Sequence, residues 1–211
     1  MNRALVVLAV VLLAPVPAQA VGIGVDLSGV LIEPQDVGFR STVGDGSAAL
    51  FEARVMGRVW SGLVIEGGYS YGDIDGSLRG GSPTHLELHG AILGVRWQQR
   101  LASWIDVYGR LDGVVRWGGF TVKDSVVNVA SDAWCGGAEV AGGIELHLPA
   151  TVFFDAPDES QQDLSVGVTV DAGYAWLSDL VLEGATPGGV TDLGGMSLST
   201  AVVRVGVVLW F

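Results

Sequence analysis

Large apolar residues alternate with polar, charged or small residues through most of the chain after residue 20. The clearest example is the segment 104–117, in which Asp106, Arg110, Asp112 and Arg116 all fall in one of the two alternating sets. Successive side chains of a strand point to opposite faces, whereas a helix with 3.6 residues per turn would spread these four charges around its circumference. The segment is therefore predicted to be a β-strand with one apolar and one polar face.

Seven further segments show the same period of two, so the pattern predicts eight strands. They lie near residues 23–28, 51–59, 63–71, 85–97, 104–117, 139–148, 165–176 and 200–211. After residue 20 the chain contains no run of about twenty apolar residues, so helical membrane spans are excluded. An apolar chain built from about ten-residue alternating segments is instead typical of a transmembrane β-barrel.

The fourth segment changes phase along its length. Leu86 and Leu88 belong to one alternating set, whereas Leu93 and Val95 belong to the other. A β-bulge inserts one residue into a strand and reverses the side to which the following residues point. We expect a bulge near Gly90–Ala91 that restores one consistent apolar face.

The connections between these segments differ in length. The long ones, at residues 33–47, 73–83, 118–132 and 178–195, are polar or rich in glycine, and two short turns lie near 60–62 and 98–103. Bacterial barrels have short periplasmic turns and longer outer loops, so the long connections are predicted to be outer loops. The connection 149–163 breaks this pattern, and we expect an elongated hairpin or a mobile flap there. Aromatic girdles are expected from Trp60, Trp97, Trp104, Trp117, Trp176 and Trp210 near the segment ends.

The first twenty residues have the layout of a secretory signal peptide. A basic start at Arg3 precedes a short apolar run, and Pro15, Pro17 and small residues up to Ala20 follow it. We therefore expect residues 1–20 to be cleaved during export and residues 21–211 to form a single barrel domain. Removing Arg3, the one charged residue in 1–20, changes the formal net charge from −12 to −13. This acidic balance argues against nucleic acid as a partner.

The last strand carries a resemblance to a known family. Val203, Val205, Val207 and Leu209 alternate before the final Phe211. Together with a signal peptide and eight alternating segments, this ending resembles the small eight-stranded outer-membrane barrels related to the barrel of outer-membrane protein A. The resemblance implies an eight-stranded antiparallel up-and-down barrel in the outer membrane, surrounded by lipid. It also implies that these five alternating residues are the signal read by the barrel assembly machinery. Relatives often continue into a peptidoglycan-binding domain, which we expect this chain to lack because it stops at Phe211.

The polar sides of the eight segments give the charges expected inside the barrel. The acidic ones are Asp26, Glu52, Glu66, Glu87, Asp106, Asp112, Glu139, Glu145 and Asp171, and the basic ones are Arg54, Arg58, Arg96, Arg110, Arg116 and Arg204. An eight-stranded barrel is only wide enough for side chains to fill or for one small ligand. Arginines that bridge carboxylates would satisfy one another there, so a cross-linked plug is expected. The alternative is a narrow pore for small solutes that is gated or slightly cation-selective.

No cofactor or metal is expected. The sequence His85-x-Glu87-x-His89 is the one constellation with ligand potential, but alternate residues of a strand lie about 6.6 Å apart, which makes joint tetrahedral ligation awkward. The single cysteine, Cys135, is expected to fill apolar space.

An enzymatic function is not expected either. A lipid-modifying enzyme would need a serine, a histidine and an acid within hydrogen-bond reach at the lipid-facing rim, and the sequence shows neither a His-x-Ser pair on a late strand nor a Gly-x-Ser-x-Gly elbow. The leading hypothesis is thus a non-enzymatic barrel with a structural or surface-interaction role. The sequence names no surface ligand.

Overall fold

The computed structural model describes residues 22–34, 36, 39–40, 48–60, 62–77, 81–123, 128–148, 165–186 and 189–211. The strands are β1 (Ile23–Pro34), β2 (Ala48–Trp60), β3 (Leu63–Ser77), β4 (Pro83–Ala102), β5 (Ile105–Lys123), β6 (Asn128–Leu148), β7 (Ser165–Leu177), β8 (Asp179–Thr186), β9 (Gly189–Ser197) and β10 (Thr200–Trp210). The predicted signal peptide at 1–20 and the predicted hairpin or flap at 149–163 lie outside the described residues. No helix in the described part is long and apolar enough to cross a membrane.

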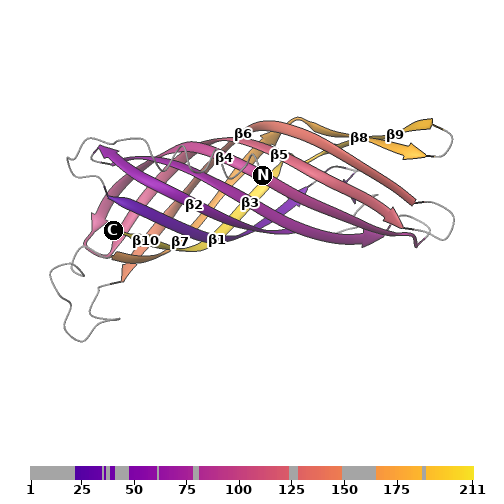
Figure 1. Ribbon diagram of the computed structural model, residues 1–211. Helices are drawn as coiled ribbons and strands as arrows, with labels where there is room; N and C mark the ends of the chain where they lie inside the picture. Colours follow the sequence, from indigo (N-terminus) through magenta and orange to yellow (C-terminus); the bar gives the residue numbers. More distant parts are fainter. Residues whose placement is uncertain are drawn as a thin grey trace.

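Eight of the strands form a closed antiparallel barrel in the order β1-β10-β7-β6-β5-β4-β3-β2 (Figure 1). The first and last barrel strands pair with each other, from Gly24 opposite Trp210 to Pro34 opposite Thr200, and so close the sheet. Within the closed part every strand is paired on both sides, which is the condition for a β-structure to span a membrane. The predicted eight-stranded up-and-down barrel is confirmed.

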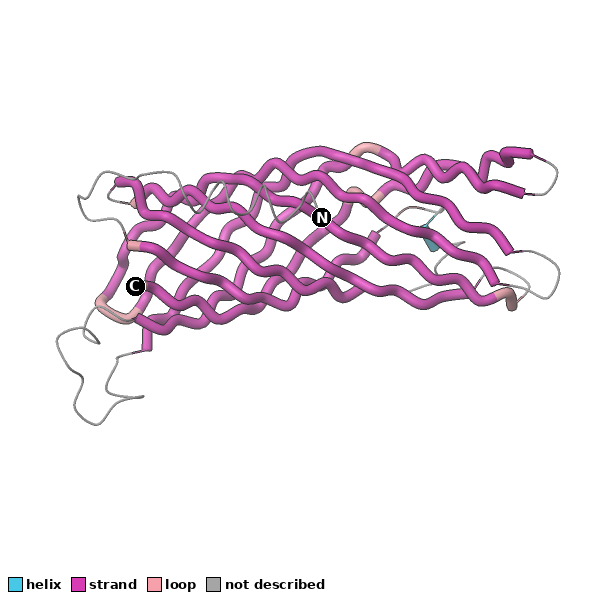
Figure 2. The backbone as a smooth tube through the Cα atoms, viewed as in Figure 1, coloured by secondary structure: helices cyan, strands magenta, loops and turns pink. Residues whose placement is uncertain are grey.

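The two ends of the barrel differ. At one end, which we call the turn end, lie the turn between Trp60 and Leu63, the turn between Ala102 and Ile105, and the paired residues Ile23 and Phe211. At the opposite end, called the loop end, β3, β4, β5 and β6 extend well beyond their neighbours, and β8 and β9 form a separate hairpin (Figures 1 and 2).

Several residues predicted to lie in outer loops belong to strands instead. Residues 73–77 continue β3, 118–123 continue β5, and 128–132 already belong to β6. Most of the predicted loop 178–195 forms the β8–β9 hairpin. These segments were mistaken for loops because their glycine and polar content is high, whereas their backbone groups are paired with neighbouring strands.

The outward face carries an apolar band between two sets of aromatic residues. Trp60, Trp97 and Trp104 are more than half exposed near the turn end, and Tyr69, Tyr174, Trp134 and Trp176 are exposed toward the loop end. From Trp104 to Trp117 the chain covers about 40 Å along the strand direction, which a tilt of about 45° reduces to about 30 Å along the barrel axis, close to the thickness of a bilayer core. Trp210, predicted for the girdle, instead points inward and is buried.

The barrel interior has two layers. Toward the turn end most inward side chains are charged or polar, as described below, and a smaller buried cluster of Met56, Val64, Val208 and Trp210 lies beside them. Toward the loop end the inward side chains are apolar: Val30 and Ile32 of β1, Leu86 and Leu88 of β4, Phe120 and Val122 of β5, and Leu177 of β7 are all buried in one cluster. Leu180, Leu182, Met196 and Leu198 from the β8–β9 hairpin and its exit complete this cluster. Cys135 also lies in it as a free, buried thiol, as expected.

This layering explains the phase change in the fourth segment. The pairing of β4 with β3 and with β5 runs without a register shift through Gly90 and Ala91, so the predicted bulge there is wrong. Leu86 and Leu88 face the interior, while His85, Glu87 and His89 face outward. The apolar side chains change from the outer to the inner face of the strand where it leaves the apolar band. Beyond the band its outer face meets water, and its inner face packs in the apolar cluster.

Candidate functional site

The turn-end half of the interior holds a network of buried ion pairs. Its centre is Arg54 on β2, whose Nη1 donates to Glu66 Oε1 at 2.8 Å and to Asp112 Oδ2 at 2.9 Å. The Nη2 of Arg54 also donates to Glu52 Oε2 at 3.0 Å. All four side chains are at most 1% exposed. One guanidinium thus contacts three carboxylates contributed by three different strands.

A second cluster extends the network toward β6, β7 and β10. Arg204 Nε donates to Glu52 Oε2 at 2.9 Å, and its other nitrogens lie 2.5 Å from Glu139 Oε1 and 3.3 Å from Asp171 Oδ1. Arg110 Nη2 donates to the same Asp171 oxygen at 3.0 Å. Glu52 is shared by Arg54 and Arg204, so the two clusters are continuous. Planar guanidinium groups with five donors are suited to such shared contacts.

A third group of contacts lies closer to the turn end. Arg96 donates to Glu145 and stacks on the ring of Tyr108, with 3.6 Å between Cζ and the ring centroid. Trp210 Nε1 donates to Glu145 Oε1 at 2.8 Å, and Tyr108 donates to Asp171 Oδ2 at 2.9 Å. Trp210 and Tyr108 were not predicted as members of the network. The alternation of the sequence places both on the inward face, and that signal could have identified them.

The structure buries thirteen of the fifteen residues predicted to carry interior charge. They are Asp26, Glu52, Arg54, Glu66, Arg96, Asp106, Arg110, Asp112, Arg116, Glu139, Glu145, Asp171 and Arg204. The structure contradicts the prediction that Glu87 lies inside the barrel. Its side chain is 45% exposed on the outer face, and its Oε1 lies 3.1 Å from His89 Nε2. The prediction for Glu87 was wrong because it relied on the bulge that is absent. Arg58 is half-buried at the turn end, with its guanidinium over the ring of Trp210.

The network is not fully hydrogen-bonded. Among the described residues, buried side-chain atoms of Glu66, Arg96, Arg110, Asp112, Glu139, Asp26 and Arg116 have no hydrogen-bond partner. Arg116 is fully buried next to the apolar cluster, and its Nε and Nη1 have no hydrogen-bond partner among the described residues. Asp26 Oδ1 likewise has none. Together the buried groups in the described chain comprise eight carboxylates and five guanidinium groups, so the interior carries an excess of acid.

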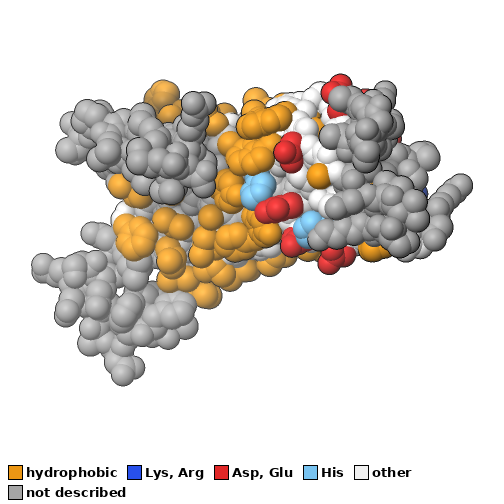
Figure 3. All heavy atoms as spheres, turned by 45° about the vertical axis from the view of Figure 1, so that its right-hand side comes forward, with side chains coloured by type: hydrophobic (Ala, Val, Ile, Leu, Met, Phe, Trp, Pro, Cys, Tyr) orange, Lys and Arg blue, Asp and Glu red, His pale blue; other side chains and the backbone are white. Residues whose placement is uncertain are grey.

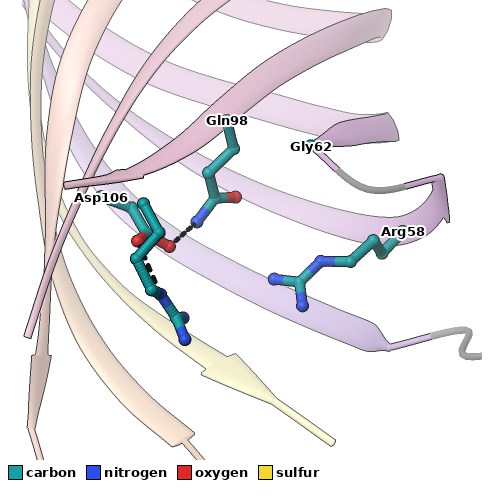
Figure 4. Close-up of a pocket in the computed structure, with 5 residues that line it drawn as sticks. Arg58, Gly62, Gln98 and Asp106 are labelled. Carbon is teal, nitrogen blue, oxygen red and sulfur yellow. Dashed lines mark hydrogen bonds and ion pairs between the residues drawn. The ribbon is translucent and has the colours of Figure 1, made fainter. Parts of the chain in front are cut away.

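A pocket of about 240 Å³ opens at the turn end, lined by Arg58, Gly62, Gln98, Arg100 and Asp106 (Figure 4). We call this opening the mouth of the barrel. Asp106 binds two of its other residues, because Gln98 Nε2 donates to its Oδ2 at 2.6 Å and Arg100 Nε donates to its Oδ1 at 3.0 Å. Figure 4 shows Arg58 extending into the same space from the other side. The mouth therefore presents two arginines to anything that enters from this end.

Asp106 also takes part in a chain of three polar side chains. The Nε2 of His147 lies 2.8 Å from Asp106 Oδ2, and its Nδ1 lies 3.2 Å from the Oγ of Ser165. These are the residue types of a serine hydrolase triad, but the two ring nitrogens have exchanged roles relative to it: there the serine contacts Nε2 and the acid contacts Nδ1. The group lies inside the mouth, where His147 and Asp106 are largely buried, and not at a lipid-facing rim.

The residues predicted as an assembly signal lie together on the outer face. Val203, Val205 and Val207 are 44–55% exposed, and Phe211 is 61% exposed at the turn end. Leu209 shares their side of β10, as the alternating burial of that strand shows. They form a continuous apolar ridge on the last strand, next to β1.

Solved structures of outer-membrane proteins share this architecture. OprG, an outer membrane protein from Pseudomonas aeruginosa, matches with a TM-score of 0.60 and 11% sequence identity over 92% of this chain and 97% of its own. A major outer membrane protein from Thermus thermophilus matches with a TM-score of 0.57 and 11% sequence identity, over 92% of this chain and 100% of that chain. Neisserial surface protein A matches with a TM-score of 0.50 and 10% sequence identity, over 92% of this chain and 98% of its own. No protein-family model and no curated protein matches the sequence. The chain thus has the fold of the small eight-stranded outer-membrane barrels.

Proposed function

We propose that this protein is a non-enzymatic outer-membrane barrel with a closed interior, which reinforces the envelope and presents its loop end to the outside. The observation that carries the proposal is the layering of the interior. Ion pairs link the walls of the turn-end half, and the apolar cluster, completed by side chains from the β8–β9 hairpin and its exit, occupies the loop-end half.

Each layer opposes the passage of ions for a different reason. In the charged layer, a permeating ion would have to displace guanidinium and carboxylate groups that are already paired with one another. In the apolar layer, it would have to shed its water with no polar replacement, which is far more costly. A continuous wet path would require both layers to open, so a pore is the less favoured alternative. The pocket at the turn end would then be a closed vestibule.

The ends of the barrel suggest how it is oriented. Short turns and strand termini mark the periplasmic side of bacterial barrels, and longer connections mark the outer side. We therefore place the turn end in the periplasm and the β8–β9 hairpin outside. The hairpin is held in place, since Ser178 N donates to Gly136 O at 3.0 Å and Ser199 Oγ donates to Leu177 O at 2.9 Å. Its buried leucines anchor it as an ordered projection for surface contacts, where the sequence predicted an outer loop that is polar or rich in glycine.

Export and assembly follow the same proposal. Residues 1–20 would be removed as a signal peptide, and the barrel assembly machinery would read the ridge formed by Val203, Val205, Val207, Leu209 and Phe211. Outer-membrane lipid would then surround the apolar band. Changing Phe211 to Ala should lower the yield of assembled barrel in the outer membrane while leaving refolding in detergent intact.

Solute flux into vesicles tests the closed interior. The chain is refolded into vesicles, its folded state is verified by faster migration of the unboiled sample on a detergent gel, and swelling in a small sugar is recorded. We expect the swelling rate of empty vesicles. A rate that rises with the amount of folded protein, as it does for a general porin used as the positive control, would overturn the proposal in favour of a pore.

A further inference from the structure

A group of potential metal ligands lies on the outer face of the β3–β4 hairpin, beyond the aromatic residues of the loop end. Asp75 of β3 pairs directly with His85 of β4, and Asp73 lies two residues before Asp75 on the same face. Figure 3 shows histidine and acidic side chains in a row beside the apolar band. The row begins where the band ends, since His89 stacks on Trp117 at 5.5 Å between ring centroids and His85 lies further out, opposite Thr121.

The three side chains converge on a small volume. His85 Nδ1 lies 3.2 Å from Asp73 Oδ1 and 2.9 Å from Asp75 Oδ1, and the three donor atoms all lie within 4.8 Å of one another. In a tetrahedral zinc site with bonds of about 2.1 Å, neighbouring donor atoms are separated by about 3.4 Å. The two separations from His85 Nδ1 lie within about 0.5 Å of this value, and the two carboxylate oxygens, at most 4.8 Å apart, can approach each other by small side-chain rotations.

The sequence pattern drew attention to a different set of potential metal ligands. Alternate residues of one strand are poorly spaced for joint ligation, which is why His85-x-Glu87-x-His89 was set aside. Pairing across two strands removes that obstacle, because the Asp75–His85 pair brings its donors together and Asp73 reaches the same nitrogen diagonally. His89 is engaged elsewhere, with Tyr69 and with Glu87 Oε1 at 3.1 Å.

The surroundings leave room to complete a coordination shell. Asp75 and His85 line a pocket of about 280 Å³ together with Pro83, Thr84 and Thr121. Two carboxylates held near one imidazole also repel each other, and a cation between them would relieve that repulsion. Imidazole nitrogen combined with carboxylate oxygen favours zinc and its neighbours over calcium or magnesium, which prefer oxygen alone.

We propose that Asp73, Asp75 and His85 bind a divalent transition-metal ion of the zinc type at the outer surface of the barrel, with the remaining coordination positions open to water. The ion clips β3 to β4 above the lipid and adds positive charge to an acidic surface. The site is independent of the closed interior, so its failure would leave the proposed function untouched.

Zinc binding to the refolded chain, prepared without a histidine tag, tests this site. Isothermal titration in detergent micelles at pH 7.5 should show one zinc ion bound per chain. His85→Gln and Asp75→Asn should each weaken the affinity at least about tenfold, as loss of one of three protein ligands implies. Cobalt(II), used as a spectroscopic substitute, should give a visible absorption band that these two variants lose.

His89→Gln is the matched control, because it removes the other outward histidine of the same strand. It should leave zinc affinity unchanged within about twofold. Three results would overturn the proposal: absence of binding up to millimolar zinc, unchanged affinity in His85→Gln, or an equal loss in His89→Gln. Heat-dependent gel migration shows that each variant is folded, so a loss of binding cannot be attributed to a failed barrel.

Discussion

The guanidinium of Arg54 on β2 and the carboxylate of Asp112 on β5 meet inside the barrel, with 2.9 Å between Nη1 and Oδ2, although 58 residues separate them in the chain. Two strands, β3 and β4, lie between β2 and β5 in the barrel wall. The contact therefore crosses the interior and connects the walls directly. It requires β3 and β4 to be paired and the sheet to be curved, so it depends on the arrangement of at least four strands.

Removal of the Arg54 side chain should be strongly destabilising. Arg54→Ala would leave Glu52, Glu66 and Asp112 buried with one guanidinium fewer, and loss of one partner from a buried pair costs about 3–5 kcal/mol. The free energy of unfolding, measured in urea with the chain refolded in lipid vesicles, should fall by that amount.

Arg58→Ala is the control for this change. Arg58 lies on the same strand but is half-buried at the mouth, where it stacks on Trp210 with 4.8 Å between Cζ and the ring centroid. A cation–π contact of this kind contributes about 0.5–1 kcal/mol. Equal losses in the two variants would contradict a central role for Arg54.

Glycine at position 94 makes room for the same network. A Cβ atom there would clash with the carboxylate of Asp112 and lie 2.6 Å from the backbone oxygen of Leu111. Gly94→Ala should therefore lower the free energy of unfolding by about 1–3 kcal/mol, as overpacked interiors do. Gly57→Ala adds the same atom into open space on β2 and should change stability by less than about 0.5 kcal/mol. A larger loss in Gly57→Ala than in Gly94→Ala would show that interior crowding is not the cause.

The pKa of His85 should lie above its ordinary value of about 6.5. The chief cause is the hydrogen bond between Nδ1 and the carboxylate of Asp75, and the negative charges of Asp73 and Glu87 act in the same direction. On β5, the residue opposite His85 is Thr121, which carries no charge that would change this pKa. Because folding raises this pKa, the protonated imidazole stabilises the fold at pH below about 6.5, and the contribution disappears as the pH rises through the folded-state pKa.

An NMR titration of the metal-free protein tests whether the pKa of His85 is raised. The midpoint for the His85 ring should exceed 6.5, and Asp75→Asn should bring it down. A midpoint that is unaffected by Asp75→Asn would show that the contact does not form in solution.

The Ser165–His147–Asp106 chain should have a structural role. We expect the refolded protein to release no more product from a chromogenic short-chain ester than Ser165→Ala does, because the histidine nitrogens are arranged opposite to the hydrolase pattern and Asp106 is already shared with Gln98 and Arg100. Hydrolysis that disappears in Ser165→Ala and persists in Ser28→Ala, a change at a buried serine on β1, would instead establish an enzyme.

The sequence sufficed to predict the barrel because one physical rule governs most of each strand. In the apolar band, one side faces lipid and the other faces neighbouring side chains, so the period of two is strong in segments such as 104–117. The same rule placed Arg54, Arg204 and Asp171 on the inward face. It could not supply their partners, because Arg54 and Asp112 are brought together only by the order and stagger of the strands.

The rule fails where the strands leave the band. At Leu86 and Leu88 the apolar side faces inward, and at His85 and Glu87 the polar side meets water, so the pattern reverses without any irregularity of the backbone. A bulge and a change of surroundings produce the same sequence pattern. For that reason Glu87 was misplaced and the Asp73–Asp75–His85 group was not foreseen.

Single-channel recording in a planar bilayer tests the closed interior most directly. Protein shown to be folded by its heat-dependent gel migration should produce no current steps at any voltage that the bilayer tolerates, because the ion pairs around Arg54 and the apolar cluster around Leu86 and Leu180 both block the axis. Steady, reproducible steps whose size changes in Arg110→Ala or Asp106→Asn would contradict the account and establish a pore through the charged interior.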